Sequence, residues 1–195
     1  GDYDTAVVSY SQALDRLLPD KATPGDLDRQ HRTLVEDLFR VLGLSFSYQG
    51  GAPAVAELFE RVGTKPWEPL VYERYAGQLQ EREQYTDAMA VYQQYIDNHP
   101  FSEQAPHYAV RIMDIYREGG FPEAIPAAQT RFVEQYGVRS AYWQQAPDPV
   151  RGQIRDQLIV LLPELANRHY LKAQDASDAA VRNHQYDQAA TFYLD

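Results

Sequence analysis

The 195-residue chain contains no cysteine, only three lysines and no long apolar segment. The lack of cysteine excludes disulfides and metal sites built on thiolates. No run of about 18 apolar residues is present, so the sequence predicts no helix that crosses a membrane. The first residues, Gly-Asp-Tyr-Asp, also lack the basic and then apolar pattern of a signal peptide. We therefore expect no direct insertion of this chain into a membrane.

Positive charge is scarce as well. The chain has 18 Lys and Arg against 28 Asp and Glu, which gives a formal net charge of −10. No cluster of basic residues is visible, and binding of nucleic acid depends on neutralised phosphates. Nucleic acid is therefore not an expected partner. An acidic surface keeps a protein soluble and can also steer a basic partner toward it.

Catalytic motifs are missing too. The sequence has no nucleophile elbow, no P-loop and no dinucleotide-binding glycine motif. Its five histidines form no zinc-binding spacing, and we interpret His99, which flanks a predicted turn together with His107, as a residue that caps carbonyls. Carboxylate pairs such as Glu57 and Glu60 fall on helical faces that we expect to be exposed. The sequence predicts no enzyme, no metal and no cofactor.

What the sequence does contain is a repeated spacing of an aromatic residue and an alanine three positions later. The spacing occurs at Tyr3/Ala6, Tyr85/Ala88, Phe121/Ala124 and Tyr186/Ala189. Residues three and four apart share one face of a helix. The small alanine lets a neighbouring helix approach closely, and the aromatic rings fill the space beside the contact. The spacing predicts an all-α protein made of packed helix pairs.

Two such pairs have clear ends. Pro69 and Pro106 suit the first turn of a helix, Gly119-Gly120 suits a tight break, and Pro100 ends a helix. We predict helix pairs over 69–102 and 105–138. In the second pair, Pro126 either kinks the second helix or makes it start late.

The block 69–102 resembles one tetratricopeptide repeat. The matching positions are Tyr72, Tyr75, Ala76, Leu79, Tyr85, Ala88, Tyr92, Tyr95 and Pro100. The block 105–138 resembles the family more weakly. The resemblance implies an α-solenoid, a right-handed superhelix of antiparallel helix pairs, of which this chain is a fragment. The junction from Tyr95 to Pro106 is similar to that of bacterial envelope repeat proteins, and the stretch from Gly120 to Trp143 is similar to large multi-repeat proteins of Gram-negative bacteria. That likeness implies a periplasmic or outer-membrane-associated location.

The remaining segments fit the array less regularly. Residues 1–18 and 184–195 are interpreted as second helices of truncated repeats, and 28–62 as a divergent helix pair. Residues 139–183 are interpreted as an irregular helical insertion. Within it, we expect one helix over about 150–162 and another that begins at Pro163 and runs to about Asn183.

The resemblance also implies which residues face a partner, because the first helix of each repeat lines the concave groove of this family. The candidate groove residues are Glu73, Arg74, Gln80, Glu81, Met113, Tyr116 and Arg117. The same mapping also gives Gly77, Ala109 and Val110, which are not among the candidates. We therefore expect a protein or peptide partner whose identity the sequence does not give. The alternative is a carbohydrate-binding or carbohydrate-active module, which the 15 tyrosines, Trp67 and Trp143 would serve.

Overall fold

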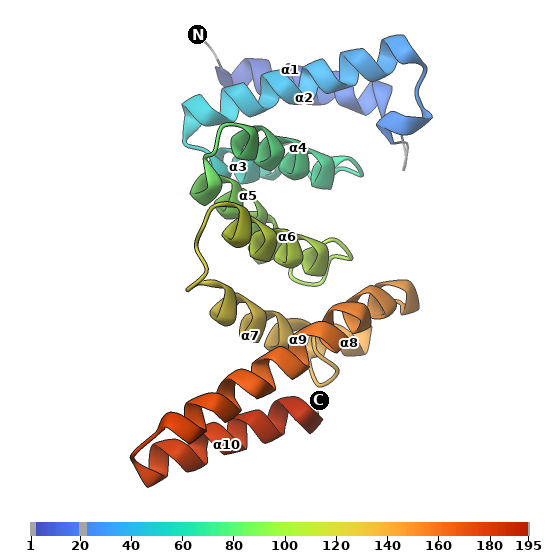
Figure 1. Cartoon of the computed structure of the whole chain (residues 1–195). Coiled ribbons are helices and arrows are strands. Elements are labelled where there is room, and N and C mark those ends of the chain that lie inside the picture. Colours follow the sequence, from blue (N-terminus) through green and yellow to red (C-terminus); the bar gives the residue numbers. More distant parts are fainter. Residues whose placement is uncertain (1–2, 20–22, 195) are drawn as a thin grey trace. The chain divides into compact units, whose positions relative to one another are not determined.

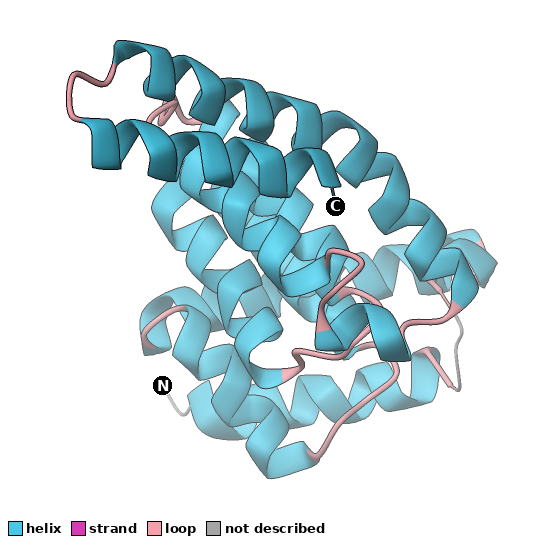
Figure 2. Ribbon diagram, turned by 90° about the horizontal axis from the view of Figure 1, so that it is seen from below, coloured by secondary structure: helices cyan, strands magenta, loops and turns pink. Residues whose placement is uncertain are grey.

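A computed structural model describes residues 3–19 and 23–194, and these residues are folded almost entirely into helices (Figures 1 and 2). They form ten α-helices and one short 3-10 helix, and no strand occurs among them. The predicted all-α class is confirmed. The chain divides into two compact units, Gly1–Pro100 and Phe101–Asp195. Over the residues that are described, no helix has the length and apolar character needed to cross a membrane.

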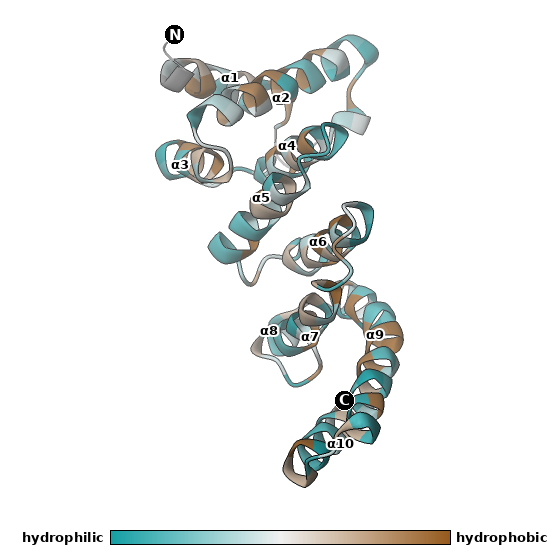
Figure 3. Ribbon diagram, turned by 60° about the vertical axis from the view of Figure 1, so that its left-hand side comes forward, coloured by the Kyte–Doolittle hydropathy of each residue, from teal (hydrophilic) through white to brown (hydrophobic). Residues whose placement is uncertain are grey.

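Unit 1 contains five α-helices and the 3-10 helix. They are α1 (Tyr3–Leu17), η1 (Pro24–Asp26), α2 (Arg29–Gln49), α3 (Ala52–Val62), α4 (Glu68–Glu81) and α5 (Tyr85–Asn98). Hydrophobic and hydrophilic residues alternate along each helix (Figure 3), as expected where one face packs on a neighbour and the other faces solvent.

Local sequence explains where α2 begins and ends. The Asp28 carboxylate accepts hydrogen bonds from the backbone N–H groups of Gln30 at 2.9 Å and His31 at 3.0 Å, so it caps the helix. Gly50 and Gly51 then adopt φ values of 109° and 80°, which side chains disfavour. The turn between α2 and α3 therefore depends on both glycines.

Aromatic rings and small alanines build the core of unit 1. The Phe59 ring lies 5.7 Å from the Trp67 ring and 6.0 Å from the Tyr72 ring, and Tyr72 meets Tyr95 edge-on at 5.1 Å. Ala88 of the repeated spacing is fully buried. Its small side chain lets α5 pack closely, as the spacing predicted.

Unit 2 contains the other five α-helices. They are α6 (Ala105–Glu118), α7 (Ile125–Tyr136), α8 (Ala141–Gln145), α9 (Asp148–Asp175) and α10 (Ala179–Leu194). Pro126 stands in the first turn of α7, so the helix starts late, which was one of the two predicted outcomes. Phe121 and Ala124 precede this helix, and the prediction that their spacing lies on a helical face was wrong.

The prediction of a helix boundary at Pro163 was also wrong. α9 continues through Pro163 to Asp175, and α10 starts at Ala179. Proline removes the hydrogen bond to the carbonyl four residues earlier, here that of Ile159. Ile159 and Pro163 both lie on the exposed face, where water can satisfy that carbonyl. Buried Leu161 and Leu165 hold the opposite face of α9 on both sides of the proline.

A buried polar residue joins α7 to α9. The Gln129 amide donates to Glu164 Oε2 at 2.8 Å, and its oxygen accepts from Arg168 Nη1 at 3.2 Å and Nη2 at 3.1 Å. Since a buried amide without partners is costly, this network fixes the register of the two helices. It therefore positions the part of α9 that lies beside α7.

Candidate functional site

A pocket in unit 2 lies among α6, α7 and α9, and we call it the α6/α9 pocket. Its volume is about 260 Å³. Its apolar floor consists of Pro106, Val110, Phe132 and Ile154. Its polar rim consists of His107, Gln153, Asp156 and Gln157.

Helical spacing brings these side chains together. On α6, Val110 lies four residues after Pro106 and three after His107, so all three share one face. On α9, Asp156 and Gln157 follow Gln153 by three and four residues. Phe132 of α7 and Ile154 of α9 are nearly fully buried and close the bottom of the pocket.

The polar rim of the pocket has no partner within the described part of the chain. Neither His107 nor any of the three rim residues of α9 makes a hydrogen bond or ion pair with another described residue. Most of their side chains are exposed, and Gln157 is half-buried. Four polar groups with unused hydrogen-bonding capacity therefore surround an apolar floor. Binding sites commonly combine these two features.

The size of the pocket limits what it can hold. Pockets for small molecules and cofactors usually measure about 300–1,000 Å³. The α6/α9 pocket is smaller, and the volume of about 260 Å³ fits one side chain of a partner better than a whole cofactor.

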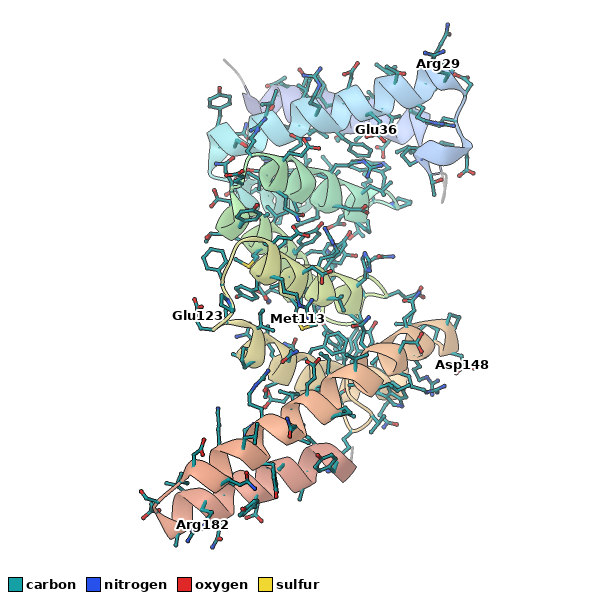
Figure 4. All side chains as sticks on the ribbon, in the orientation of Figure 1. Arg29, Glu36, Met113, Glu123, Asp148 and Arg182 are labelled. Carbon is teal, nitrogen blue, oxygen red and sulfur yellow. The ribbon has the colours of Figure 1, made fainter. Side chains whose placement is uncertain are left out.

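The predicted groove residues of unit 1 lie on α4, and one of them is held by α2. Arg74 donates from Nε and Nη2 to the two carboxylate oxygens of Glu36, each at 3.0 Å, and its Nη1 lies 3.6 Å from Glu73 (Figure 4 labels Glu36). The pairing with Glu36 is a fork geometry that binds α2 to α4. Gln80 is half-buried and Glu81 is exposed. In unit 1, Arg74 therefore contributes to helix packing as well as to the surface.

The predicted groove residues of unit 2 lie on α6 but outside the pocket. Met113 is 2% exposed and lies between α6 and α7 (Figure 4), so it serves the core and not a partner. The Tyr116 ring meets the Phe121 ring edge-on at 6.4 Å. Arg117 pairs with Asp114 at 2.7 Å. Val110, from the same mapping, is the position that lines the pocket.

His99 caps the end of α5, as expected, because its backbone N–H donates to the carbonyl of Tyr95 at 2.9 Å, and its side chain has a partner as well. Its Nε2 lies 2.7 Å from Glu68 Oε1, and the Glu68 side chain is only 3% exposed. This pair ties the start of α4 to the end of α5. Across the described residues, no group of three or more His, Asp or Glu side chains is arranged to hold a metal ion.

The Glu68 carboxylate is only partly compensated. Burial raises the pKa of Glu68 above its ordinary value of 4.5, although the hydrogen bond and charge of His99 oppose the rise. Its Oε2 atom is buried without a hydrogen bond within the described structure. Burial, together with the Glu68 charge, also raises the pKa of the Tyr72 hydroxyl. The buried Glu68 carboxylate therefore lowers the stability of the folded protein by an amount that depends on pH.

Replacing Glu68 with glutamine is expected to stabilise the protein more at pH 8 than at pH 4.5. A raised pKa means that the folded state binds more protons than the unfolded state, so stability falls as the pH rises above about 4.5. Urea unfolding at several pH values measures the difference between Glu68→Gln and the wild type. Glu81→Gln, an exposed change on the same helix, is the control. A difference that does not vary with pH would contradict this account.

Among the described residues, each unit also has a hollow of similar size. The first measures about 280 Å³ and lies beside the Gly50-Gly51 turn. There the Tyr75 hydroxyl lies 3.3 Å from Ser47 Oγ, and burial raises the pKa of Tyr75. The second measures about 210 Å³ and lies between the end of α7 and α10. In the first hollow, the Tyr75 hydroxyl already has a partner in Ser47. The second hollow is smaller than both the first hollow and the α6/α9 pocket.

Comparison with models of known protein families, with curated proteins and with solved structures gave no match. Any argument about function therefore rests on the residues and geometry of this chain.

Sequence reasoning did not find the rim residues of α9. They fall in the segment interpreted as an insertion outside the repeats, where no groove positions were assigned. A usable signal was present, because Gln153, Asp156 and Gln157 place three polar side chains beside the apolar Ile154 at helical spacing. What the spacing lacks is the information that α9 lies beside α6.

Proposed function

We propose that the chain is a non-catalytic binding module of helical repeats, which holds a segment of a protein partner in the α6/α9 pocket. The observation that carries this proposal is the unpaired polar rim around an apolar floor. A peptide side chain can cover the floor and supply the hydrogen bonds that the rim lacks.

The helix pairs support the same reading. α4 and α5 coincide with the first block that resembles a tetratricopeptide repeat, and α6 and α7 with the second. In that family, the first helices of successive repeats line the binding surface, and α6 holds that place in its pair. We extend the proposal to a superhelical arrangement of the pairs and to a role in a larger protein of the bacterial envelope. These extensions rest on the resemblance alone.

The carbohydrate alternative has less support, because only one of the chain's two tryptophans, the half-buried Trp143, reaches the surface. A sugar-binding tryptophan presents its ring to solvent. Trp67 is only 1% exposed, and its indole N–H donates to Asp15 Oδ1 at 3.0 Å. Its ring therefore belongs to the core of unit 1.

A peptide-display selection with a pair of matched variants tests the proposed function. Peptides selected on the wild-type protein are measured by fluorescence polarisation against Val110→Trp and Val160→Trp. The first substitution fills the pocket, and the second adds the same ring at an exposed position of α9 that does not line the pocket. We expect Val110→Trp to weaken binding at least about tenfold, which corresponds to about 1.4 kcal/mol, and Val160→Trp to leave it unchanged.

Circular dichroism should show both variants folded like the wild type. Selected peptides that bind Val110→Trp as tightly as the wild type would show that the pocket is not the binding site. A selection that yields no binding peptide would contradict the module itself.

A further inference from the structure

We infer that the α6/α9 pocket receives an arginine side chain from a basic peptide segment of the partner. This inference rests on the proposed function and names the chemistry of the residue that is bound. It comes from the combination of an apolar floor with a polar rim in which Asp156 forms no ion pair with a described residue.

The floor suits the stem of a long side chain. Arginine has a chain of methylene groups that packs on apolar surface while its charged end stays near water. The half-buried Val110 of α6 offers such a surface, and the buried Pro106 and Ile154 lie beside it in the pocket. A short polar side chain would leave this floor uncovered.

The rim suits the guanidinium group. Asp156 provides a carboxylate with no partner among the residues described, and the amides of Gln153 and Gln157 provide further acceptors beside it. A guanidinium carries five N–H donors in a planar fork and is matched by several acceptors spread over one edge. The ammonium of lysine places its charge at a single point and can bond to fewer of these acceptors. The bond to Asp156 is charge-assisted, which makes it the strongest of the set.

Among the described residues, no arginine near this rim along α6 and α9 forms an ion pair with it, including Arg155, which directly precedes Asp156 and is exposed. Arg111 lies 3.5 Å from Asp114, and Arg151 lies 3.3 Å from Asp148 while its Nε donates to the carbonyl of Ala146 at 2.8 Å. The Asp156 carboxylate is therefore available to a cation from outside. The formal net charge of −10 favours the approach of a basic segment.

An acidic side chain fits this rim less well than a basic one. An acidic side chain would meet Asp156 at close range, and like charges without a counterion repel each other. A neutral apolar side chain would cover the floor but leave the rim unpaired. Specificity for arginine thus comes from both the floor and the rim.

Amide NMR titration of the full chain tests the inference with small capped probes. Nα-acetyl-arginine N-methylamide stands for an arginine within a peptide. Its citrulline analogue keeps the shape without the charge, and its norleucine analogue keeps only the apolar stem. We expect the arginine probe to shift the amide signals of His107, Val110, Gln153 and Gln157. We expect the citrulline and norleucine probes to bind at least about tenfold more weakly.

Free arginine distinguishes the source of the side chain. It carries an α-ammonium and an α-carboxylate, which an arginine within a peptide lacks, so a pocket for a peptide side chain should bind it no more tightly than the capped probe. Tighter binding of the free amino acid would show that the pocket serves a metabolite and would overturn the assignment to a peptide.

Two aspartate variants isolate the role of the rim. Asp156→Asn should weaken binding of the arginine probe about tenfold. Asp175→Asn removes the same charge from the exposed end of α9 and should leave binding unchanged. Equal binding of the arginine and norleucine probes, no loss in Asp156→Asn, or no shift with any probe would each overturn the inference. Display-selected peptides that lack arginine but lose binding in Val110→Trp would overturn it too, while leaving the binding module intact.

Discussion

Replacing Trp67 with alanine is expected to lower the free energy of unfolding by about 3–5 kcal/mol, the usual cost of removing a buried aromatic ring. The indole packs against Phe59 at 5.7 Å and donates to Asp15 at 3.0 Å. Asp15 also accepts from Lys65 at 2.7 Å. Trp67 therefore connects α1, α3 and the start of α4, and its loss leaves a cavity and a weakened network.

Urea unfolding followed by far-ultraviolet circular dichroism measures this effect. Trp67→Phe separates the ring from its N–H group, because it keeps most of the packing and loses the hydrogen bond to a carboxylate. It should cost less than the alanine variant. A loss below about 1 kcal/mol for Trp67→Ala would place the indole outside the core.

A second large effect is expected from Tyr92, compared with Tyr193. Both tyrosines stand four residues after the alanine of the repeated spacing, in α5 and α10. Tyr92 is 2% exposed, whereas Tyr193 is 65% exposed. We expect Tyr92→Ala to cost about 3–5 kcal/mol, as for other buried aromatic residues. Tyr193→Ala should change stability by no more than about 0.5 kcal/mol.

The comparison of these two variants separates the sequence pattern from its packing. The two tyrosines hold the same position in the spacing but differ in burial. The sequence pattern alone predicts equal losses of stability for the two variants, and the structure predicts unequal ones. Equal losses in thermal or urea unfolding would mean that the exposed face of α10 is covered in solution.

Much of the helical framework could be predicted, because its signals are local. Pro69 and Pro106 stand in first turns, and Gly120 has the φ of 75° that suits the expected tight break before Phe121. Each of these residues acts through the backbone within a few positions of itself. Ala88 also behaved as expected, since a fully buried alanine reports a close helix contact.

Features that depend on distant residues could not be predicted. Whether Pro163 ends a helix depends on the exposure of the carbonyl that it leaves free, and the sequence does not show this. Met113 has the character of a binding residue, but α7 covers it. His99 found a buried partner 31 positions away in Glu68.

The candidate site could be predicted from the sequence only in part, for the same reason. The resemblance pointed to the face of α6 that carries Val110, but it assigned no role to α9. Because α7 holds α9 through Gln129, three polar residues of an apparent insertion come to lie across from His107. The pocket is a product of tertiary packing and not of the repeat spacing.

The most direct test of the binding module is to map where a display-selected peptide contacts the protein. Amide NMR signals of the full chain are followed as the unlabelled peptide is added. The proposal predicts that the largest shifts fall on the α6 and α9 residues that line the pocket, with α1 to α3 unaffected. Shifts confined to α1–α5, or spread evenly over the chain, would contradict it.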